Sequence, residues 1–143
     1  MATITSVDSA IEYGKKMQMD NPWTANGVWT VSLDDAFMTK GFHEVFTHYY
    51  GNEQSVPVVN YVRGAIVDHV TNIILYRRAE GEGLTAVDLE IIRKVAEACA
   101  VLNISFMDYI LFNHSPKNKT PMIISARMQG ISTIHYKSPQ KGV

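Results

Sequence analysis

Two hydrophobic periodicities alternate along the N-terminal third of the chain, and they predict a helix followed by two strands. Residues 6–19 place apolar side chains at helical spacing, and Asn21-Pro22 interrupts that pattern. Residues 27–33 combine β-branched, aromatic and apolar types, which favours a strand. Phe42–Tyr50 is aromatic and β-prone and is predicted to be the partner strand, after a turn at Asp34-Asp35.

The middle of the chain predicts a helix on each side of a short central strand. Residues 59–70 repeat apolar positions every three or four residues, which indicates a helix packing one face on a sheet. Ile73-Ile74-Leu75 is an uninterrupted apolar run, typical of a strand buried on both faces. Residues 77–84 are predicted to form a polar loop. Thr85-x-x-Asp88 then resembles a capping box that opens a second helix.

The C-terminal third predicts further strands and completes an α/β order. Asn103 can end the second helix, and residues 104–112 are predicted to form a strand. Residues 113–120 are loop-like. Residues 122–126 and 131–135 are predicted to form a terminal hairpin around Gln129-Gly130. The order ββαβαβ, with additions at both ends, predicts an α/β domain with a mixed sheet in two or three layers.

Composition narrows the class of protein. The chain has 143 residues, 46% of them hydrophobic, which fits a single folded domain over residues 1–143. The net charge of −1 does not indicate nucleic acid as a partner. The single cysteine, Cys99, excludes an intrachain disulfide and favours a reducing, cytoplasmic location. The N-terminus carries no apolar run of signal-peptide type, and no membrane association is expected.

Five features, taken in order from Val28 to Phe112, resemble the RadC-like branch of the JAB/MPN metalloprotease-like superfamily. They are a helix, an apolar strand, the segment Tyr76–Gly81, the Thr85-x-x-Asp88 helix start and the strand Asn103–Ile110. The resemblance implies the JAB/MPN fold, which is similar to the cytidine-deaminase-like α/β sandwich. Residues 1–26 and 113–143 would then be a helical N-terminal extension and a C-terminal extension.

The resemblance also implies a site from which the metal ligands are missing. The family binds one zinc through two histidines and an aspartate, with a glutamate that activates water and a serine nearby. The corresponding positions here are Tyr76, Arg78, Asp88, Glu44 and Thr85. A catalytic zinc needs three protein ligands, and an arginine has no lone pair to give. The histidines present show no ligand-like spacing; they are His43, His48, His69, His114 and His135. We therefore expect no metal, no cofactor and no catalytic residues.

The alternation of side chains along a strand predicts what fills the site. Tyr76 and Arg78 should point to one side and Arg77 to the other. If the resemblance holds, Glu44 and Asp88 converge on the same pocket. The Arg78 guanidinium would then replace the zinc charge and pair with one or both carboxylates. Thr85 and Asp88 also have a purely structural explanation as a helix cap.

Three functions remain open from the sequence. The leading hypothesis is a catalytically inactive domain that acts by binding another protein, or a second copy of the chain, and the resemblance is typical of bacterial, phage or mobile-element proteins. The first alternative is a phosphate-bearing ligand or nucleotide held by Arg63, Tyr76, Arg77 and Arg78 in the former active-site pocket. The second alternative is a zinc hydrolase with a non-standard site.

Overall fold

A five-stranded mixed sheet, covered by helices on both faces, forms the framework of the protein. The computed structural model describes residues 2–20, 27–45, 56–115 and 118–131. In chain order the elements are α1 (Val7–Asp20), β1 (Gly27–Leu33), β2 (Thr39–Val45), α2 (Val59–Asp68), β3 (Asn72–Glu80), α3 (Ala86–Leu102), β4 (Ser105–Ser115) and β5 (Asn118–Ser125). The predicted order ββαβαβ with additions at both ends is confirmed.

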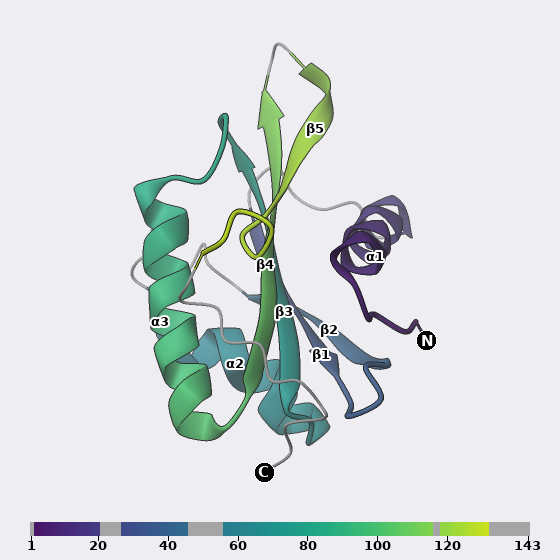
Figure 1. The fold of residues 1–143 in the computed structure, drawn as a ribbon, viewed down its shortest axis with the longest axis vertical. Coiled ribbons are helices and arrows are strands. Elements are labelled where there is room, and N and C mark those ends of the chain that lie inside the picture. Colours follow the sequence, from purple (N-terminus) through teal and green to yellow (C-terminus); the bar gives the residue numbers. More distant parts are fainter. Residues whose placement is uncertain (1, 21–26, 46–55, 116–117, 132–143) are drawn as a thin grey trace.

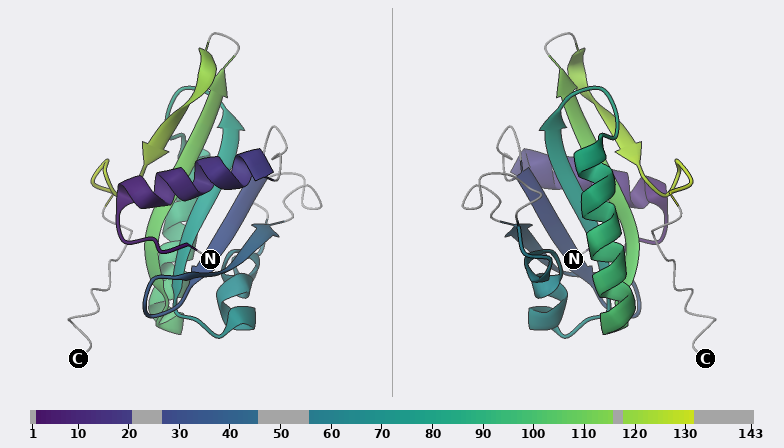
Figure 2. Two further views of the ribbon diagram at one scale, coloured as in Figure 1. Left: turned by 90° about the vertical axis from the view of Figure 1, so that its right-hand side faces the viewer. Right: turned by 90° about the vertical axis from the view of Figure 1, so that its left-hand side faces the viewer.

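The strands lie in the order β2-β1-β3-β4-β5, and only the central pair is parallel. β3 runs parallel to β4, with α3 as the crossover between them, while the pairs β1–β2, β1–β3 and β4–β5 are antiparallel. α2 and α3 cover one face of the sheet and α1 covers the other (Figures 1 and 2). The domain therefore has three layers.

Each face of the sheet has its own hydrophobic core because successive strand residues point in opposite directions. Ile73 and Leu75 pack toward α2 and α3, whereas Ile74 and Tyr76 pack toward α1. The first eight residues of β3 are buried or nearly so, which explains its uninterrupted apolar start. Gly14 lets α1 lie close over the sheet, since a Cβ there would stand 2.7 Å from the Tyr76 ring.

Three boundaries differ from the sequence prediction. Residues 77–80, predicted as loop, continue β3, because each lies in register with a residue of β4. Residues 113–115 and 118–120, also predicted as loop, belong to β4 and β5. The predicted terminal hairpin is wrong, because residues 122–125 pair with β4 instead and a turn follows at residues 126–130. The predicted strand Phe42–Tyr50 is confirmed as far as Val45; residues 46–50 and 132–135 lie outside the described residues.

Candidate functional site

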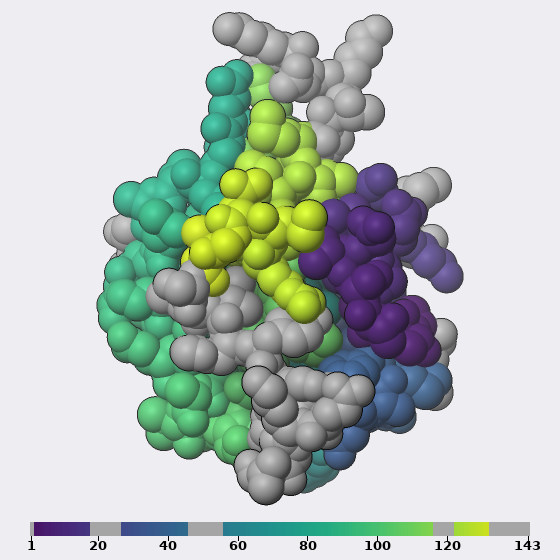
Figure 3. Space-filling view, in the orientation of Figure 1, coloured from purple at the N-terminus to yellow at the C-terminus, as the bar shows by residue number. Residues whose placement is uncertain are grey.

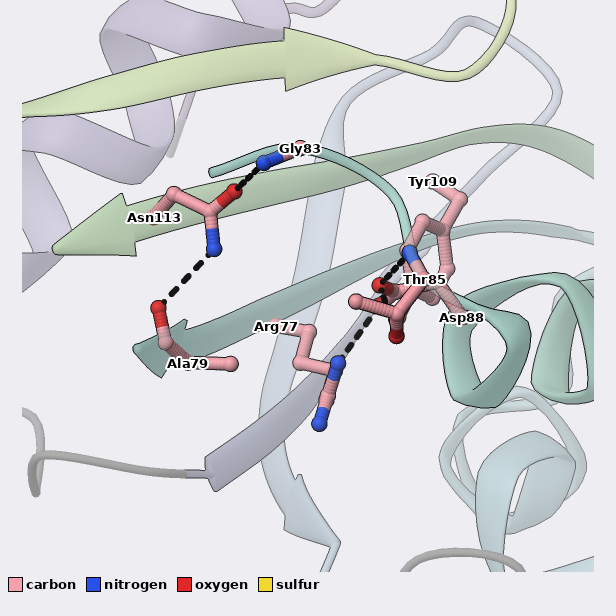
Figure 4. Close-up of polar contacts among 7 residues, drawn as sticks. All are labelled: Arg77, Ala79, Gly83, Thr85, Asp88, Tyr109 and Asn113. Atoms are coloured by element: carbon pink, nitrogen blue, oxygen red, sulfur yellow. Dashed lines mark hydrogen bonds and ion pairs between the residues drawn. The ribbon is translucent and has the colours of Figure 1, made fainter. Parts of the chain in front are cut away.

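The conspicuous polar cluster in the described interior is centred on the carboxylate of Asp88. Asp88 lies in the first turn of α3 and is fully buried. Its Oδ1 accepts a hydrogen bond from Nη1 of Arg77 at 2.6 Å and another from the Tyr109 hydroxyl at 2.5 Å. Arg77 comes from β3 and Tyr109 from β4, so two neighbouring strands and a helix start meet at this carboxylate (Figure 4).

The second oxygen of Asp88 is engaged by the residue that caps α3. Oδ2 accepts from the Thr85 backbone N–H at 2.8 Å and from the Thr85 hydroxyl at 3.0 Å. Thr85 has extended backbone angles, as an N-cap residue should, and the two residues form the predicted capping box. Both Asp88 oxygens therefore accept two hydrogen bonds each.

The electrostatics of this cluster keep the Tyr109 hydroxyl neutral. Burial and the adjacent Asp88 charge raise the pKa of Tyr109 well above its ordinary value, so its hydroxyl keeps the proton that it donates. A buried carboxylate is costly unless it is paired and hydrogen-bonded, and Asp88 meets both conditions. Asp88 thus holds β3, β4 and α3 together.

The loop from β3 to α3, which borders this cluster, is held in place by Asn113. The Asn113 side chain donates to the Ala79 carbonyl at 3.0 Å and accepts from the Gly83 N–H at 2.5 Å (Figure 4). Gly81 and Gly83 adopt φ values of 141° and 118°, which glycine tolerates far better than other residues. This loop is therefore shaped by backbone conformation and a single amide side chain.

The remaining predicted ligand positions do not join Asp88. Tyr76 faces α1, where its hydroxyl donates to the Ala10 carbonyl at 2.7 Å, and burial raises its pKa well above the ordinary value. Alternation along β3 places Arg78 on the same side as Tyr76. The expected pairing of Arg78 with Asp88 is therefore wrong, and Arg77 takes that role. Tyr76 and Arg77 point to opposite faces of the sheet, as predicted. Asp88, however, lies on the face to which Arg77 points, and not on the face of Tyr76 and Arg78.

Glu44 and Arg63 are also separated from Asp88. Glu44 is exposed on β2 and lies opposite Trp29 in the register, so its side chain projects from the α1 side of the sheet, and the expected convergence with Asp88 is wrong. Arg63 is exposed on α2, where it borders β2. The proposed ligand set of Arg63, Tyr76, Arg77 and Arg78 is thus distributed over three places in the fold.

A second polar cluster, which the sequence analysis did not identify, joins β1, β2 and the end of α2. Nε2 of His43 lies 2.7 Å from Oδ2 of Asp68, and the Ser32 hydroxyl donates to the same oxygen. Burial raises the pKa of Asp68, but the hydrogen bonds from Ser32 and His43 lower it by more, so the net pKa lies below its ordinary value. Ser32 and His43 are too far apart in sequence to form a recognisable motif.

Two glycines make room for the second cluster. A Cβ at Gly64 would collide with the His43 ring, and one at Gly41 would collide with both His43 and Asp68. His43 therefore lies flat over α2 beside a surface pocket of about 350 Å³ between β2 and α2. Ser32 and His43 both contact Asp68 Oδ2, and among the described residues no hydroxyl is hydrogen-bonded to the histidine, so the described arrangement lacks the geometry of a serine nucleophile with its base.

A second buried acid, Asp108, fixes the turn after β5. It accepts hydrogen bonds from the Ser125 hydroxyl at 2.5 Å and from the backbone N–H of Arg127 at 3.0 Å. Burial raises the pKa of Asp108. Figure 3 shows the turn lying against the start of α1, where Arg127 and Val7 line a common crevice. Asp108 is therefore a hydrogen-bonded structural acid.

Neither metal binding nor thiol chemistry has a visible site in the described part of the chain. Among residues 2–20, 27–45, 56–115 and 118–131, no three histidine, cysteine, aspartate or glutamate side chains gather as a metal would require. Cys99 is buried, and burial raises the pKa of its thiol to about 12, so it stays protonated near pH 7.

Comparison with known proteins does not assign this chain to a family. No protein-family model matches the chain, and no curated protein has a matching sequence. Within the described residues, every helix is too short or too polar to span a membrane. The described residues provide a carboxylate inside the fold, whose two oxygens are already hydrogen-bonded, and a polar pocket at the edge of the sheet.

Proposed function

We propose that this protein is a JAB/MPN-type domain that has lost metal catalysis and acts by binding another protein. The observation that carries the proposal is the buried Arg77–Asp88 pair. Asp88 occupies the one ligand position that the resemblance retains, and both of its oxygens are already hydrogen-bonded. A zinc ion bound there would lie beside a permanent positive charge.

The electrostatic cost of adding a metal supports the same conclusion. A dication about 4 Å from a guanidinium is repelled by about 8 kcal/mol at an effective dielectric constant near 20. Arg77 is buried, so solvent screens little of this repulsion. Tyr76, at one former histidine position, donates its hydroxyl to Ala10 on the opposite face. The element order and the Thr85–Asp88 cap support the family assignment, while the ligand positions support loss of its chemistry.

Metal analysis combined with a peptidase assay tests the loss of catalysis. The purified chain should contain far less than one zinc per molecule, and added zinc should neither raise its melting temperature nor produce hydrolysis of a peptide or isopeptide substrate. An Arg77→Ala variant, in which the repelling charge is removed, serves as the comparison. One tightly held zinc per wild-type molecule, with hydrolysis, would establish the zinc-hydrolase alternative instead.

Binding to a protein is tested separately, on the exposed apolar residues of α2. Ile66 and Val67 are 50% and 60% exposed on the described surface. Partners recovered from native cells should be lost with an Ile66→Asp variant and kept with Val101→Asp, a matched change on α3 at a position that is 86% exposed. Sedimentation of the purified chain distinguishes a heterologous partner from a second copy. Retention of every partner by both variants would argue against α2 as the contact.

The phosphate-ligand alternative has less support. Three of its four expected residues, Tyr76, Arg77 and Arg78, lie on β3 and divide between opposite faces of the sheet. Of the four, Arg63 lines the described pocket between β2 and α2.

A further inference from the structure

A groove runs along the outer edge of the sheet, between β2 and α2. Four consecutive β2 residues form one wall, and α2 forms the other with one face of its helix. The helix residues are spaced at i, i+3, i+4 and i+7, as residues on a single helix face are. The volume is about 350 Å³, within the roughly 300–1,000 Å³ typical of ligand pockets. The lining residues are Phe42, His43, Glu44, Val45, Asn60, Arg63, Gly64 and Val67.

The strand wall of this groove has an available backbone edge. β2 is the last strand on its side of the sheet, so alternate N–H and C=O groups point away from β1. Ala2 and Thr3 pair with Met38 and Thr39 at the beginning of the strand. Among the described residues, no strand pairs with the outer edge of residues 41–45. A chain laid along that edge could therefore continue the sheet.

The charges in the groove favour an acidic occupant. Arg63 is exposed in the helix wall and forms no ion pair with another described residue. The His43 side chain faces α2, since it packs on Gly64, whereas Glu44 projects from the other side of the sheet. The negative charge of Asp68 is engaged by Ser32 and His43. Arg63 is thus a cation at the groove that pairs with no acid among the described residues, whereas Glu44, the acid that also lines the groove, projects from the other side of the sheet.

We propose that the β2–α2 groove binds an extended acidic peptide of a partner protein, which adds as a strand to the outer edge of β2. The proposal rests on the proposed binding function and names its partner class. Main-chain hydrogen bonds to β2 supply sequence-independent affinity, and alternate peptide side chains enter the groove. One of these side chains, or a terminal carboxylate, pairs with Arg63, and an apolar neighbour packs on Val67, which is 60% exposed.

Selection from a library of displayed random peptides tests the proposal and does not require the partner to be identified first. Recovered peptides should be rich in β-branched and acidic residues, and their binding should weaken as salt is added. Arg63→Glu should reduce affinity by up to about fivefold, as expected for loss of an exposed ion pair. Lys16→Glu, the same charge change on α1, is the matched control and should leave affinity unchanged.

N-methylation of the best peptide tests the strand geometry itself. Because only alternate peptide N–H groups face a neighbouring strand, methylation of one alternating set should abolish binding and methylation of the other should be tolerated. Binding should also slow hydrogen exchange of amides within residues 41–45. Equal tolerance of both sets would overturn strand addition, even for a peptide that depends on Arg63.

The remaining outcomes separate failure of this proposal from failure of the proposed function. One outcome would be that no peptide is recovered, while a partner protein is still captured and its binding is insensitive to Arg63→Glu. That result would overturn the groove proposal and leave the proposed binding function intact. Inorganic phosphate that protects the groove in the absence of any binding peptide would assign it to a small anion, and would also overturn the proposal. Stoichiometric zinc with hydrolysis would remove the binding function on which the proposal rests.

Discussion

Separating Arg77 from Asp88 should cost much of the stability of this domain. Arg77→Met removes the cation and leaves a fully buried carboxylate with three hydrogen-bond donors and no positive charge. Removal of one partner of a buried pair typically costs about 3–5 kcal/mol. A domain of this kind has about 5–15 kcal/mol of total stability. We therefore expect a folded but strongly destabilised variant.

The converse substitution, Asp88→Leu, should be at least as damaging. It leaves the Arg77 guanidinium buried without its carboxylate, and it removes the acceptor for the Thr85 N–H. The loss of the cap alone is measured by Thr85→Ala, for which about 1 kcal/mol is expected. The two single substitutions at the ion pair should together sum to about 6–10 kcal/mol, from the cost of orphaning each charge.

The double variant Arg77→Met/Asp88→Leu should cost far less than that sum, because an apolar pair orphans no charge. The remaining penalties are the lost cap and the unsatisfied Tyr109 hydroxyl, together about 3 kcal/mol. Urea unfolding at neutral pH measures all four proteins of the cycle, and high salt should change the coupling little because the pair is buried. If the two single effects on the free energy of unfolding add up to the effect of the double variant within about 0.5 kcal/mol, the assignment of Arg77 and Asp88 as a charge-neutralising pair is refuted.

Three further substitutions test other contacts in the structure. Tyr76→Phe removes the hydrogen bond to the Ala10 carbonyl and should cost about 1 kcal/mol, the net contribution of one hydrogen bond, because that carbonyl lies within α1 and keeps its helical donor; unchanged stability and unchanged exchange of α1 amides would contradict it. Gly64→Ala should displace the His43 ring, which the chemical shifts of that ring report by NMR; an unmoved ring would contradict the packing. Asp108→Asn should alter how the stability of the protein depends on pH. A folded pKa raised above the unfolded value stabilises the wild type at low pH, and this stability is lost as pH rises through the folded pKa. Wild-type stability relative to the variant should therefore fall from acidic toward neutral pH, and parallel thermal-denaturation profiles would contradict this.

The element order was predictable because each element carries its own local signal. β1 and the apolar start of β3 show strand-prone composition, and the Thr85–Asp88 pair marks the start of α3. The boundaries were less predictable because polar residues in a strand look like loop. Residues 77–80 resemble a loop in sequence because they are polar. Arg77 can be buried in a strand because it pairs with Asp88 in the following helix, and only the fold brings these two residues together.

The sequence predicted that an arginine of this strand would pair with a carboxylate, but it did not predict which position along the strand that arginine occupies. The sequence predicted that Arg78 would pair with a carboxylate, but the arginine that meets Asp88 is Arg77. One residue along a strand exchanges the two faces of a sheet, so an error of one position moves a side chain to the other core. The His43–Asp68 contact could not be inferred from the sequence, because it depends on how β2 and α2 pack.

The strand order also implies an order of assembly. Residues 72–125 form β3, α3, β4 and β5, which are contiguous in the chain and make one side of the sheet. The hairpin of β1 and β2 joins them through the β1–β3 pairing, which closes a long loop across β2 and α2. Long loop closures are entropically costly and form late. We therefore expect the β3–β5 half to behave as an early cooperative unit, and the β1–β3 seam to be the first boundary to open in native-state hydrogen exchange.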